Sequence, residues 1–292
     1  MTGCCLKLKE LMPSFSPKEQ NIARYIIDFP NEVVQLSIKE LAEICRTSVS
    51  SVVRLCKSAG YSGYKELCRT LSADMALIQQ ETVVYSDVRP GDTVSSIINS
   101  VCSCNMKSIE NTKTVLSVED VEKAVSCLCQ ASRIDFYAVG ATGIVAIDAH
   151  NKFVRIHKSS MSSTDPHEQV LYATSLKKGD AAVFFSYSGD TRDLLETADI
   201  VQKTGATMLS ITRYNKNPLA QKADIALYCS SPDALIRSGV MSQRIGLLTV
   251  VDILYTAVVS QTYDQVHYAL DQTRLVSAHK HINMQGTDFS SL

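Results

Sequence analysis

The sequence lacks an excess of charge of either sign. Its 292 residues include 29 Lys and Arg against 30 Asp and Glu, which excludes a chain that is basic throughout, such as a histone-like protein. One basic face is not excluded, because the total averages over all domains. The length predicts about two domains, and the 45% hydrophobic and 20% charged residues are typical of an ordinary globular protein.

The sequence also lacks a secretion signal and a membrane span. Residues 1–11 contain no apolar core of the length that a signal peptide needs. No run approaches the ~20 apolar residues of a membrane helix. We therefore expect a cytoplasmic protein whose ten cysteines are reduced thiols that pack as small apolar residues.

Metal-ligand spacing is missing as well. There is no CxxC, only Cys102-x-Cys104 and Cys127-x-Cys129. Both pairs fall in helical patterns, where residues i and i+2 point apart. A structural zinc site is the alternative interpretation of the cysteines, and this spacing disfavours it. The sequence predicts no metal and no cofactor.

The first third of the chain has the pattern of an all-helical domain. Ser16-Pro17-Lys18-Glu19 is a strong helix start, with Ser as the N-cap, Pro at the first position and Glu at the third. Ser37 opens a second helix, and Arg46-Thr47 forms a brief turn. Ser48 then caps a third helix that runs to about Ser58. The second and third helices have the spacing of a helix–turn–helix.

The third helix carries the prediction of DNA binding. Its apolar residues form one arc, and the opposite arc is small, polar and cationic. Small residues allow close approach to the major groove, where Arg can bond a guanine edge bidentately. The hydroxyls and N–H groups at the helix start suit a backbone phosphate. The predicted DNA-contacting residues are Thr47, Ser48, Ser50, Ser51, Arg54 and Lys57.

Positive charge is concentrated around this helix. From Arg46 to Arg69 there are five basic residues and a single acid, Glu66, so the near-zero total hides a local excess. A helical bundle with a solvated basic face is the alternative interpretation. The caps, the spacing, the apolar arc and the local charge together favour DNA binding.

Three stretches of this region are distinctive: Ser37-Ile38-Lys39-Glu40-Leu41-Ala42, Val52-Val53-Arg54-Leu55-Cys56-Lys57 and Gly60-Tyr61-Ser62-Gly63-Tyr64. They resemble the N-terminal domain of the RpiR-type family of bacterial transcriptional regulators. The family usually has Gly at the turn, where this chain has Arg46. A non-glycine residue in a left-handed turn costs on the order of 1 kcal/mol.

The remainder of the chain changes from helices to an alternation of strands and helices. After Ser132 this alternation predicts a parallel α/β sheet with right-handed crossovers. A linker containing Pro90-Gly91 is expected at about Tyr85–Asp92. The expected helices are Thr93–Thr112, Val118–Ala131 and Val240–Thr262, the expected strands are Arg133–Val139, Ala181–Phe185, Thr207–Thr212 and Ile225–Cys229, and an irregular tail is expected from about His279.

Two loops in this half each follow a strand and open a helix. They are Gly140-Ala141-Thr142-Gly143 and Ser186-Tyr187-Ser188-Gly189-Asp190-Thr191. Ligands of open α/β sheets bind at the carboxyl ends of the strands, and the N–H groups and dipole of a helix N-terminus suit a phosphate. Well-capped helices are the alternative interpretation. The first loop lacks the G-x-G-x-x-G pattern, which argues against a nicotinamide site.

The second loop resembles the Ser-x-Ser-Gly-x-Thr signature of sugar isomerase (SIS) domains. The similarity extends over roughly residues 118–262 and includes Ala223-Asp224-Ile225 and Arg237-Ser238-Gly239. This resemblance implies an α/β domain with a five-stranded parallel sheet flanked by helices, and a sugar-phosphate pocket. The residues that it implies for the pocket are Thr142, Ser186, Ser188, Gly189, Thr191, His167 and Arg237.

Two functions of different class remain open. The first is a DNA-binding regulator of carbohydrate metabolism genes whose operator affinity is modulated by a phosphosugar. The second is a sugar-phosphate isomerase or lyase with an accessory helical domain, since SIS folds host both. An enzyme needs a positioned acid–base pair, and Glu168, His167 and Asp190 form no persuasive pair. The helix–turn–helix favours the regulator, and no catalytic residue is predicted.

The predicted organisation has four parts. A helix–turn–helix domain at residues 1–84 is followed by a linker and connecting helix at 85–117, a SIS domain at 118–275 and an irregular tail at 276–292. A homodimer, or a dimer of dimers, would place two recognition helices on major-groove faces ~34 Å apart. The expected partners are double-stranded operator DNA, a sugar-phosphate effector and further copies of the chain, with no membrane.

Overall fold

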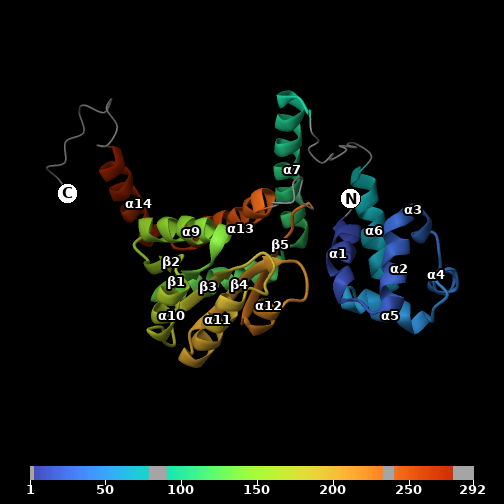
Figure 1. Cartoon of the computed structure of the whole chain (residues 1–292), viewed down its shortest axis with the longest axis horizontal. Coiled ribbons are helices and arrows are strands. Elements are labelled where there is room, and N and C mark those ends of the chain that lie inside the picture. The colour runs from blue at the N-terminus through green and yellow to red at the C-terminus, as the bar shows by residue number, and fades with distance from the viewer. Residues whose placement is uncertain (1–2, 79–90, 233–239, 279–292) are drawn as a thin grey trace.

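The computed structural model describes residues 3–78, 91–232 and 240–278. Figure 1 shows a helical unit beside an α/β unit, and α7 stands out from the α/β unit. Most of the expected linker and residues 279–292 of the expected tail fall outside the described residues, whereas residues 276–278, also expected to be irregular, end helix α14 (Tyr263–Ala278). The helical unit is built from α1 (Gly3–Leu11), η1 (Met12–Ser14), α2 (Pro17–Asp28), α3 (Pro30–Val33), α4 (Ile38–Ile44), α5 (Val49–Ser58) and α6 (Tyr64–Ile78).

Local capping explains where the helices of this unit begin. At α2 the Ser16 backbone N–H donates to the carboxylate of Glu19 at 2.9 Å. At α4 the Ser37 N–H donates to Glu40 at 2.6 Å, and the Glu40 N–H donates back to the Ser37 hydroxyl at 3.3 Å. These reciprocal bonds satisfy N–H groups that the helix itself leaves unpaired. The predicted helix starts are confirmed.

The helical unit closes around one hydrophobic core. Leu8 of α1, Ile22 of α2, Leu41 of α4 and Leu55 of α5 are all fully buried in it. The sequence patterns did not predict α1, because this nine-residue helix has no strong capping signal. Its packing against α2 and α6 stabilises it instead.

Arg46 adopts the backbone conformation that the turn between α4 and α5 requires. Its φ of +51° lies in the left-handed region, so the turn geometry that usually takes Gly is present with an exposed arginine. We expect Arg46→Gly to raise the free energy of unfolding by up to about 1 kcal/mol, because glycine removes the Cβ strain. Urea denaturation measures this. Arg24→Gly, at an exposed interior position of α2, should instead lower stability by about 1 kcal/mol; a loss at both positions would contradict the prediction.

The α/β unit contains a five-stranded parallel sheet in the order β2-β1-β3-β4-β5, as predicted. Helices cover both of its faces (Figure 1). Its elements are α7 (Val94–Val115), α8 (Val118–Gln130), β1 (Arg133–Tyr137), η2 (Gly140–Thr142), α9 (Gly143–Arg155), β2 (Ser159–Ser163), α10 (Pro166–Thr174), β3 (Ala181–Phe185), α11 (Arg192–Thr204), β4 (Thr207–Arg213), α12 (Pro218–Lys222), β5 (Ile225–Cys229), α13 (Val240–Gln261) and α14 (Tyr263–Ala278).

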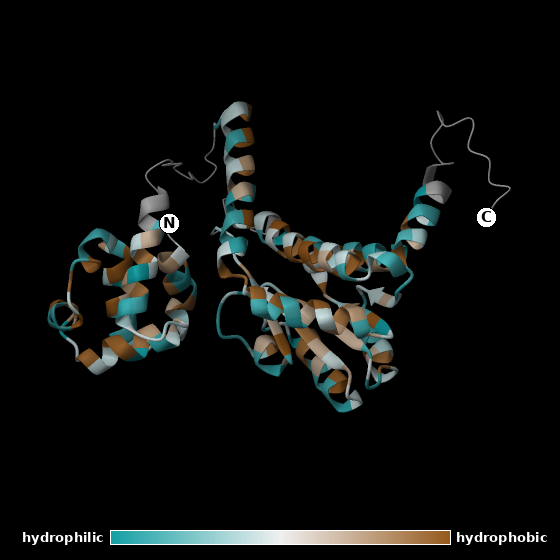
Figure 2. Cartoon of the chain, turned by 180° about the vertical axis from the view of Figure 1, so that it is seen from behind, coloured by the Kyte–Doolittle hydropathy of each residue, from teal (hydrophilic) through white to brown (hydrophobic). Residues whose placement is uncertain are grey.

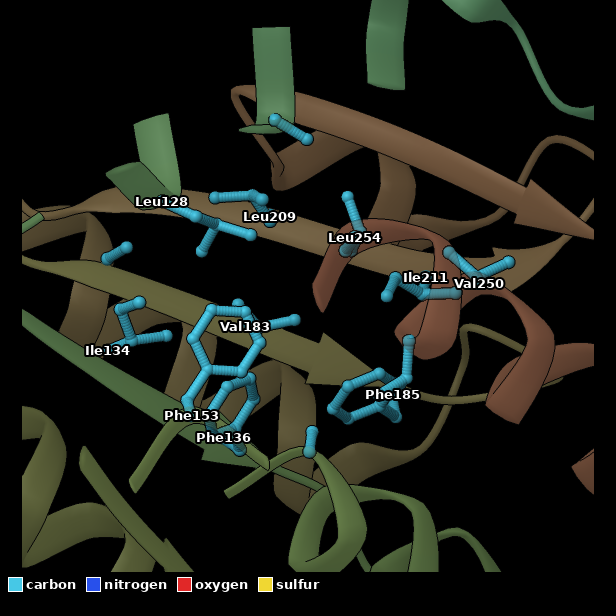
Figure 3. Close-up of a cluster of buried hydrophobic side chains, with 14 of the residues drawn as sticks. Leu128, Ile134, Phe136, Phe153, Val183, Phe185, Leu209, Ile211, Val250 and Leu254 are labelled. Atoms are coloured by element: carbon cyan, nitrogen blue, oxygen red, sulfur yellow. The ribbon is translucent and has the colours of Figure 1, made fainter. Parts of the chain in front are cut away.

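Side chains of the central strand β3 alternate between the two faces of the sheet. Val183 and Phe185 point into a core shared with α8, α9 and α13 (Figure 3). Phe184 points into a second core shared with α10, α11 and α12. Because both faces are covered, all five residues of this strand are buried. A near-continuous apolar strand is what such a sheet requires.

Strand β2 was not predicted as a strand, because its sequence Ser-Ser-Met-Ser-Ser has no apolar run. It lies at the edge of the sheet and pairs in register with β1. The buried Asp135 carboxylate accepts from the Met161 N–H at 3.2 Å and pairs with Arg133 at 2.6 Å. Edge strands need fewer apolar residues than central strands, since one side of them faces solvent.

Helix α13 corrects the expectation that no segment approaches the length and composition of a membrane helix. Ser242–Gln261 is long and apolar enough to pass that test. In the structure this helix crosses the sheet, and Val250 and Leu254 point into the core (Figure 3). Packing within the α/β unit therefore accounts for part of its apolar character, since 39% of this apolar window is buried.

Candidate functional site: a recognition helix and a hydroxyl-lined pocket

Helix α5 presents two different faces. Val52, Leu55 and Cys56 are fully buried in the core of the helical unit. Arg54 and Lys57 are exposed, together with Ser48 and Ser50 near the helix start. This arrangement has the apolar and the cationic arcs that the sequence predicted.

The hydroxyl groups at the start of α5 bond mainly to one another. The Ser48 hydroxyl lies 2.8 Å from that of Ser50 and 2.9 Å from that of Ser51, and it accepts from the Ser51 N–H at 3.3 Å. Ser51 is buried, so the structure places it among the residues that hold the helix start. The Thr47 hydroxyl oxygen is also buried, without a hydrogen-bond partner among the described residues. Of the predicted contacts, Ser48 and Ser50 therefore lie on the exposed side.

Arg54 makes an ion pair that the sequence did not reveal. Its Nε lies 3.1 Å from Oε1 of Glu19 on α2, and the side chains are 61% and 8% exposed. Burial pushes the pKa of Glu19 upward, but bonds from Ser16 and Arg54 outweigh it and lower the pKa. The pair uses Nε, so Nη1 and Nη2 lie outside this bond. The pair thus fixes the guanidinium of Arg54 at one nitrogen, while the side chain as a whole remains largely exposed.

A cavity of about 490 Å³ lies at the carboxyl ends of β1, β3 and β4. This volume is typical of a site for a small ligand. The structure brings four of the predicted residues together in its wall: Thr142, Ser186, Ser188 and Thr191. We call this cavity the hydroxyl pocket, and the segment Ser186–Thr191 in its wall the phosphate loop.

Hydrogen bonds and a glycine shape the phosphate loop. The Ser186 hydroxyl lies 3.1 Å from that of Thr191 and accepts from the Gly189 N–H at 3.1 Å. Gly189 has a φ of +71°, and a Cβ there would lie 2.0 Å from Oδ1 of Asn217. Asn217 is buried and caps α12, accepting from the Ala220 N–H at 2.9 Å. Only glycine fits this turn, so the hydroxyls depend on it for their placement.

The other predicted pocket residues lie elsewhere. His167 is exposed at the start of α10 and is not part of the pocket wall; its backbone N–H donates to Asp165 at 2.8 Å. Arg237 lies outside the described residues. Among the acid–base candidates Asp190 lines the pocket, whereas the Glu168 carboxylate accepts from the Ser163 hydroxyl at 2.7 Å. The structure therefore does not bring the three candidates together.

Three polar residues of the pocket wall were missed by the sequence analysis: Arg213, Asn215 and Gln243. Arg213 ends β4, which is the next strand to β3 in the sheet. The sequence did contain a signal for Arg213. It directly follows the predicted strand Thr207–Thr212 of the parallel sheet, and the carboxyl ends of such strands lie together where ligands bind. Arg213 adds a cation to a wall that contains four Ser and Thr hydroxyls and the carboxyl group of Asp190, and arginine binds phosphates well.

A second cavity, of about 650 Å³, lies at the amino ends of the strands, opposite the end that holds the hydroxyl pocket. Gly179, Asp180 and Thr207 line it, and they precede or begin strands β3 and β4. Ligands of parallel sheets bind at the carboxyl ends, so we do not assign a site here. Within the described residues, no three His, Cys, Asp or Glu side chains are grouped to hold a metal ion.

Comparisons with known proteins agree with both units. The helix-turn-helix domain model of the rpiR family matches residues 2–77, and the SIS domain model matches residues 127–257. An uncharacterised HTH-type transcriptional regulator of Caldanaerobacter subterraneus subsp. tengcongensis is 38% identical over 97% of this chain and 100% of that protein. The HTH-type transcriptional regulator HexR of Pseudomonas aeruginosa is 30% identical over 86% of this chain and 87% of HexR. The solved structure of Vibrio vulnificus NanR complexed with ManNAc-6P is 25% identical, has a TM-score of 0.60, and covers 96% of this chain and 100% of its own.

The fold and the sites thus define a helix–turn–helix protein that carries a SIS domain. The chain belongs to the RpiR family of transcriptional regulators. Its relatives carry the names of regulators, which supports the first of the two functions that the sequence left open, although the SIS fold also occurs in isomerases.

Proposed function

We propose that this regulator binds operator DNA through α5 and that a sugar phosphate in the hydroxyl pocket changes its affinity for that DNA. The observation that carries the proposal is the convergence of Thr142, Ser186, Ser188 and Thr191 on one cavity. Hydroxyls and helix N-termini at the carboxyl ends of parallel strands provide the donors that a phosphate needs. The complex of NanR with ManNAc-6P supports a phosphosugar as the ligand class.

The DNA-binding half of the proposal rests on the exposed face of α5. In this proposal Ser50, Arg54 and Lys57 enter the major groove, and their exposure supports it. Ser48 and the backbone at Thr47 would face a DNA phosphate from the helix start. Ser51 supports this surface from within, as its burial indicates. His167 and Arg237 remain predicted contacts to the sugar.

We further propose a cytoplasmic homodimer, or dimer of dimers, with the domain limits given above. Exposed apolar side chains on α7, namely Val94, Ile98, Met106 and Ile109, support association. Hydrophobic residues recur along this helix (Figure 2), and exposed apolar patches commonly mark protein interfaces. Carbohydrate metabolism genes are the proposed targets, because the effector would report on phosphosugar supply.

The effector is found first by thermal shift against a panel of hexose, pentose and N-acetylhexosamine phosphates. At a hundredfold excess over its Kd, the true effector adds ~2.7 kcal/mol to stability. A panel without any stabilising compound would contradict the pocket assignment.

We expect Ser186→Ala to weaken binding of that effector about tenfold, because a hydrogen bond to a charged group contributes roughly 1.5–3 kcal/mol. Titration calorimetry measures the effector Kd, and effector-free DNA affinity should not change. Ser210→Ala is the matched control. That serine is buried in neighbouring β4, and its hydroxyl has no hydrogen-bond partner among the described residues. Equal effector affinity of Ser186→Ala and wild type would count against the phosphate loop.

A further inference from the structure

We infer that Arg213 is an effector-binding residue for which the DNA-binding unit competes through Glu10. Arg213 is one of the residues that line the hydroxyl pocket, and its Nε pairs with Oε2 of Glu10 on α1. An anionic ligand in the pocket and the Glu10 carboxylate of the helical unit would therefore compete for bonds to the Arg213 guanidinium. This inference rests on the proposed function and names the contact by which the effector acts.

The Glu10 carboxylate is buried, and both of its oxygens are paired with the α/β unit. It belongs to the helical unit, yet its side chain is only 4% exposed, because it lies against the α/β unit. Its other oxygen accepts from the Ser230 hydroxyl at 3.2 Å. A carboxylate is almost never fully buried unless it is paired, so the burial of Glu10 against the α/β unit depends on the Arg213 contact.

The segment that contains Arg213 reaches both units. The Arg213 N–H donates to the Tyr187 carbonyl of the phosphate loop at 2.9 Å. The next residue, Tyr214, packs against the core of the helical unit, and its hydroxyl lies 3.9 Å from where a Cβ of Gly60 would be. Gly60 follows the recognition helix α5 closely. A movement at the pocket therefore has a short physical route to that helix.

Helix α7 is joined to the same contact. The Ser230 N–H donates to the Thr112 hydroxyl at 3.3 Å, and this hydroxyl donates to the Ser230 carbonyl at 3.2 Å. Thr112 is fully buried on α7. Ser230 thus connects Glu10 to α7 through hydrogen bonds. Loss of the Glu10 contact would therefore change the hydrogen bonding at α7 as well.

Phosphate chemistry favours the effector in this competition. A phosphate monoester carries more negative charge than one carboxylate and can bond the arginine fork bidentately with two oxygens. When Arg213 turns to the ligand, Glu10 is left buried without its cation, which is strongly unfavourable. Release of α1 from the α/β unit relieves that cost. Effector binding and docking of the helical unit then oppose each other by equal factors.

The test measures the affinity of the full-length chain for inorganic phosphate, with titration calorimetry as the readout. We expect Glu10→Gln, which removes the competing charge and keeps the shape, to tighten phosphate binding at least fivefold, a factor at the low end of ordinary coupling between sites. Ser230→Ala removes only a neutral donor to Glu10 and should tighten binding by a smaller factor. If Glu10→Gln does not fold, Ser230→Ala carries the test.

Glu122→Gln is the control for charge, because this exposed residue of α8 is absent from the hydroxyl pocket; its phosphate affinity should equal that of wild type. The inference is overturned if neither Glu10→Gln nor Ser230→Ala binds phosphate more tightly than wild type. Weaker binding by both variants would show instead that Glu10 positions Arg213 for the ligand. If Ser186→Ala still weakens phosphate binding in that case, the proposed function survives. If wild type and Ser186→Ala are both without phosphate binding, both proposals fall.

Discussion

Gly189→Ala is expected to weaken effector binding by about a hundredfold while effector-free DNA binding stays intact. The added Cβ would lie 2.0 Å from Oδ1 and 2.2 Å from Cγ of Asn217. Real Cβ atoms do not approach other atoms so closely, so the phosphate loop or Asn217 must move. The φ of +71° at Gly189 adds the strain of a left-handed alanine.

Neither partner of this clash can move cheaply. Asn217 is buried, caps α12 and donates to the Thr212 hydroxyl at 2.9 Å. The Gly189 N–H donates to the Ser186 hydroxyl. A displaced loop therefore also displaces this hydroxyl, which the proposal assigns to phosphate binding. Left-handed strain of roughly 1–2 kcal/mol and overpacking of roughly 1–3 kcal/mol together span roughly 2–5 kcal/mol, a range that includes the ~2.7 kcal/mol of a hundredfold change in Kd.

Gly179→Ala is the matched control, because it introduces left-handed backbone strain without displacing the phosphate loop. Gly179 has a φ of +93°, and nothing lies within 4 Å of an added Cβ. This variant should lose stability by a similar left-handed strain and keep its effector affinity. The two variants are compared by titration calorimetry with the effector and by thermal unfolding. Equal effector affinities would show that the phosphate loop does not depend on Gly189.

The sequence predicted those parts of the fold that depend on local signals. The capping residues Ser16, Ser37 and Ser48 placed three helix starts correctly, because a cap acts within four residues of the chain. Apolar runs identified the strands from Ala181 to Phe185 and from Ile225 to Cys229 as predicted. The resemblance to known families supplied the five-stranded sheet and the residues of the phosphate loop.

The remainder depends on contacts between distant residues. Strand β2 is polar and exists through pairing with β1, which a reading of Ser159–Ser163 alone does not reveal. The Glu10 and Arg213 pair joins residues 203 positions apart. The pair of Arg54 with Glu19 likewise needs α2 and α5 to be packed together. Long-range ion pairs have no spacing rule, so charge patterns along the chain cannot predict them.

Arg54→Ala is expected to reduce affinity for a selected operator by at least about thirtyfold. A bidentate contact of arginine with guanine contributes about 1–3 kcal/mol, and in a homodimer each substitution removes the contact from both half-sites. The loss of at least 2 kcal/mol gives that factor. The operator is obtained by selection from random duplexes, and affinities are measured by fluorescence anisotropy at several salt concentrations.

The Glu19 pair makes a second variant necessary, because Arg54→Ala also leaves a nearly buried carboxylate without its cation. Arg54→Lys keeps a positive charge beside Glu19 but lacks the planar fork that matches a guanine edge. We expect it to retain the stability of the helical unit and nonspecific DNA affinity, and to lose most discrimination between operator and random duplex. Arg155→Ala, an equal charge loss on the exposed end of α9, should leave both affinities unchanged. If Arg54→Lys discriminates as well as wild type, Arg54 contacts the DNA backbone rather than a base, and the sequence must be read by other residues of α5.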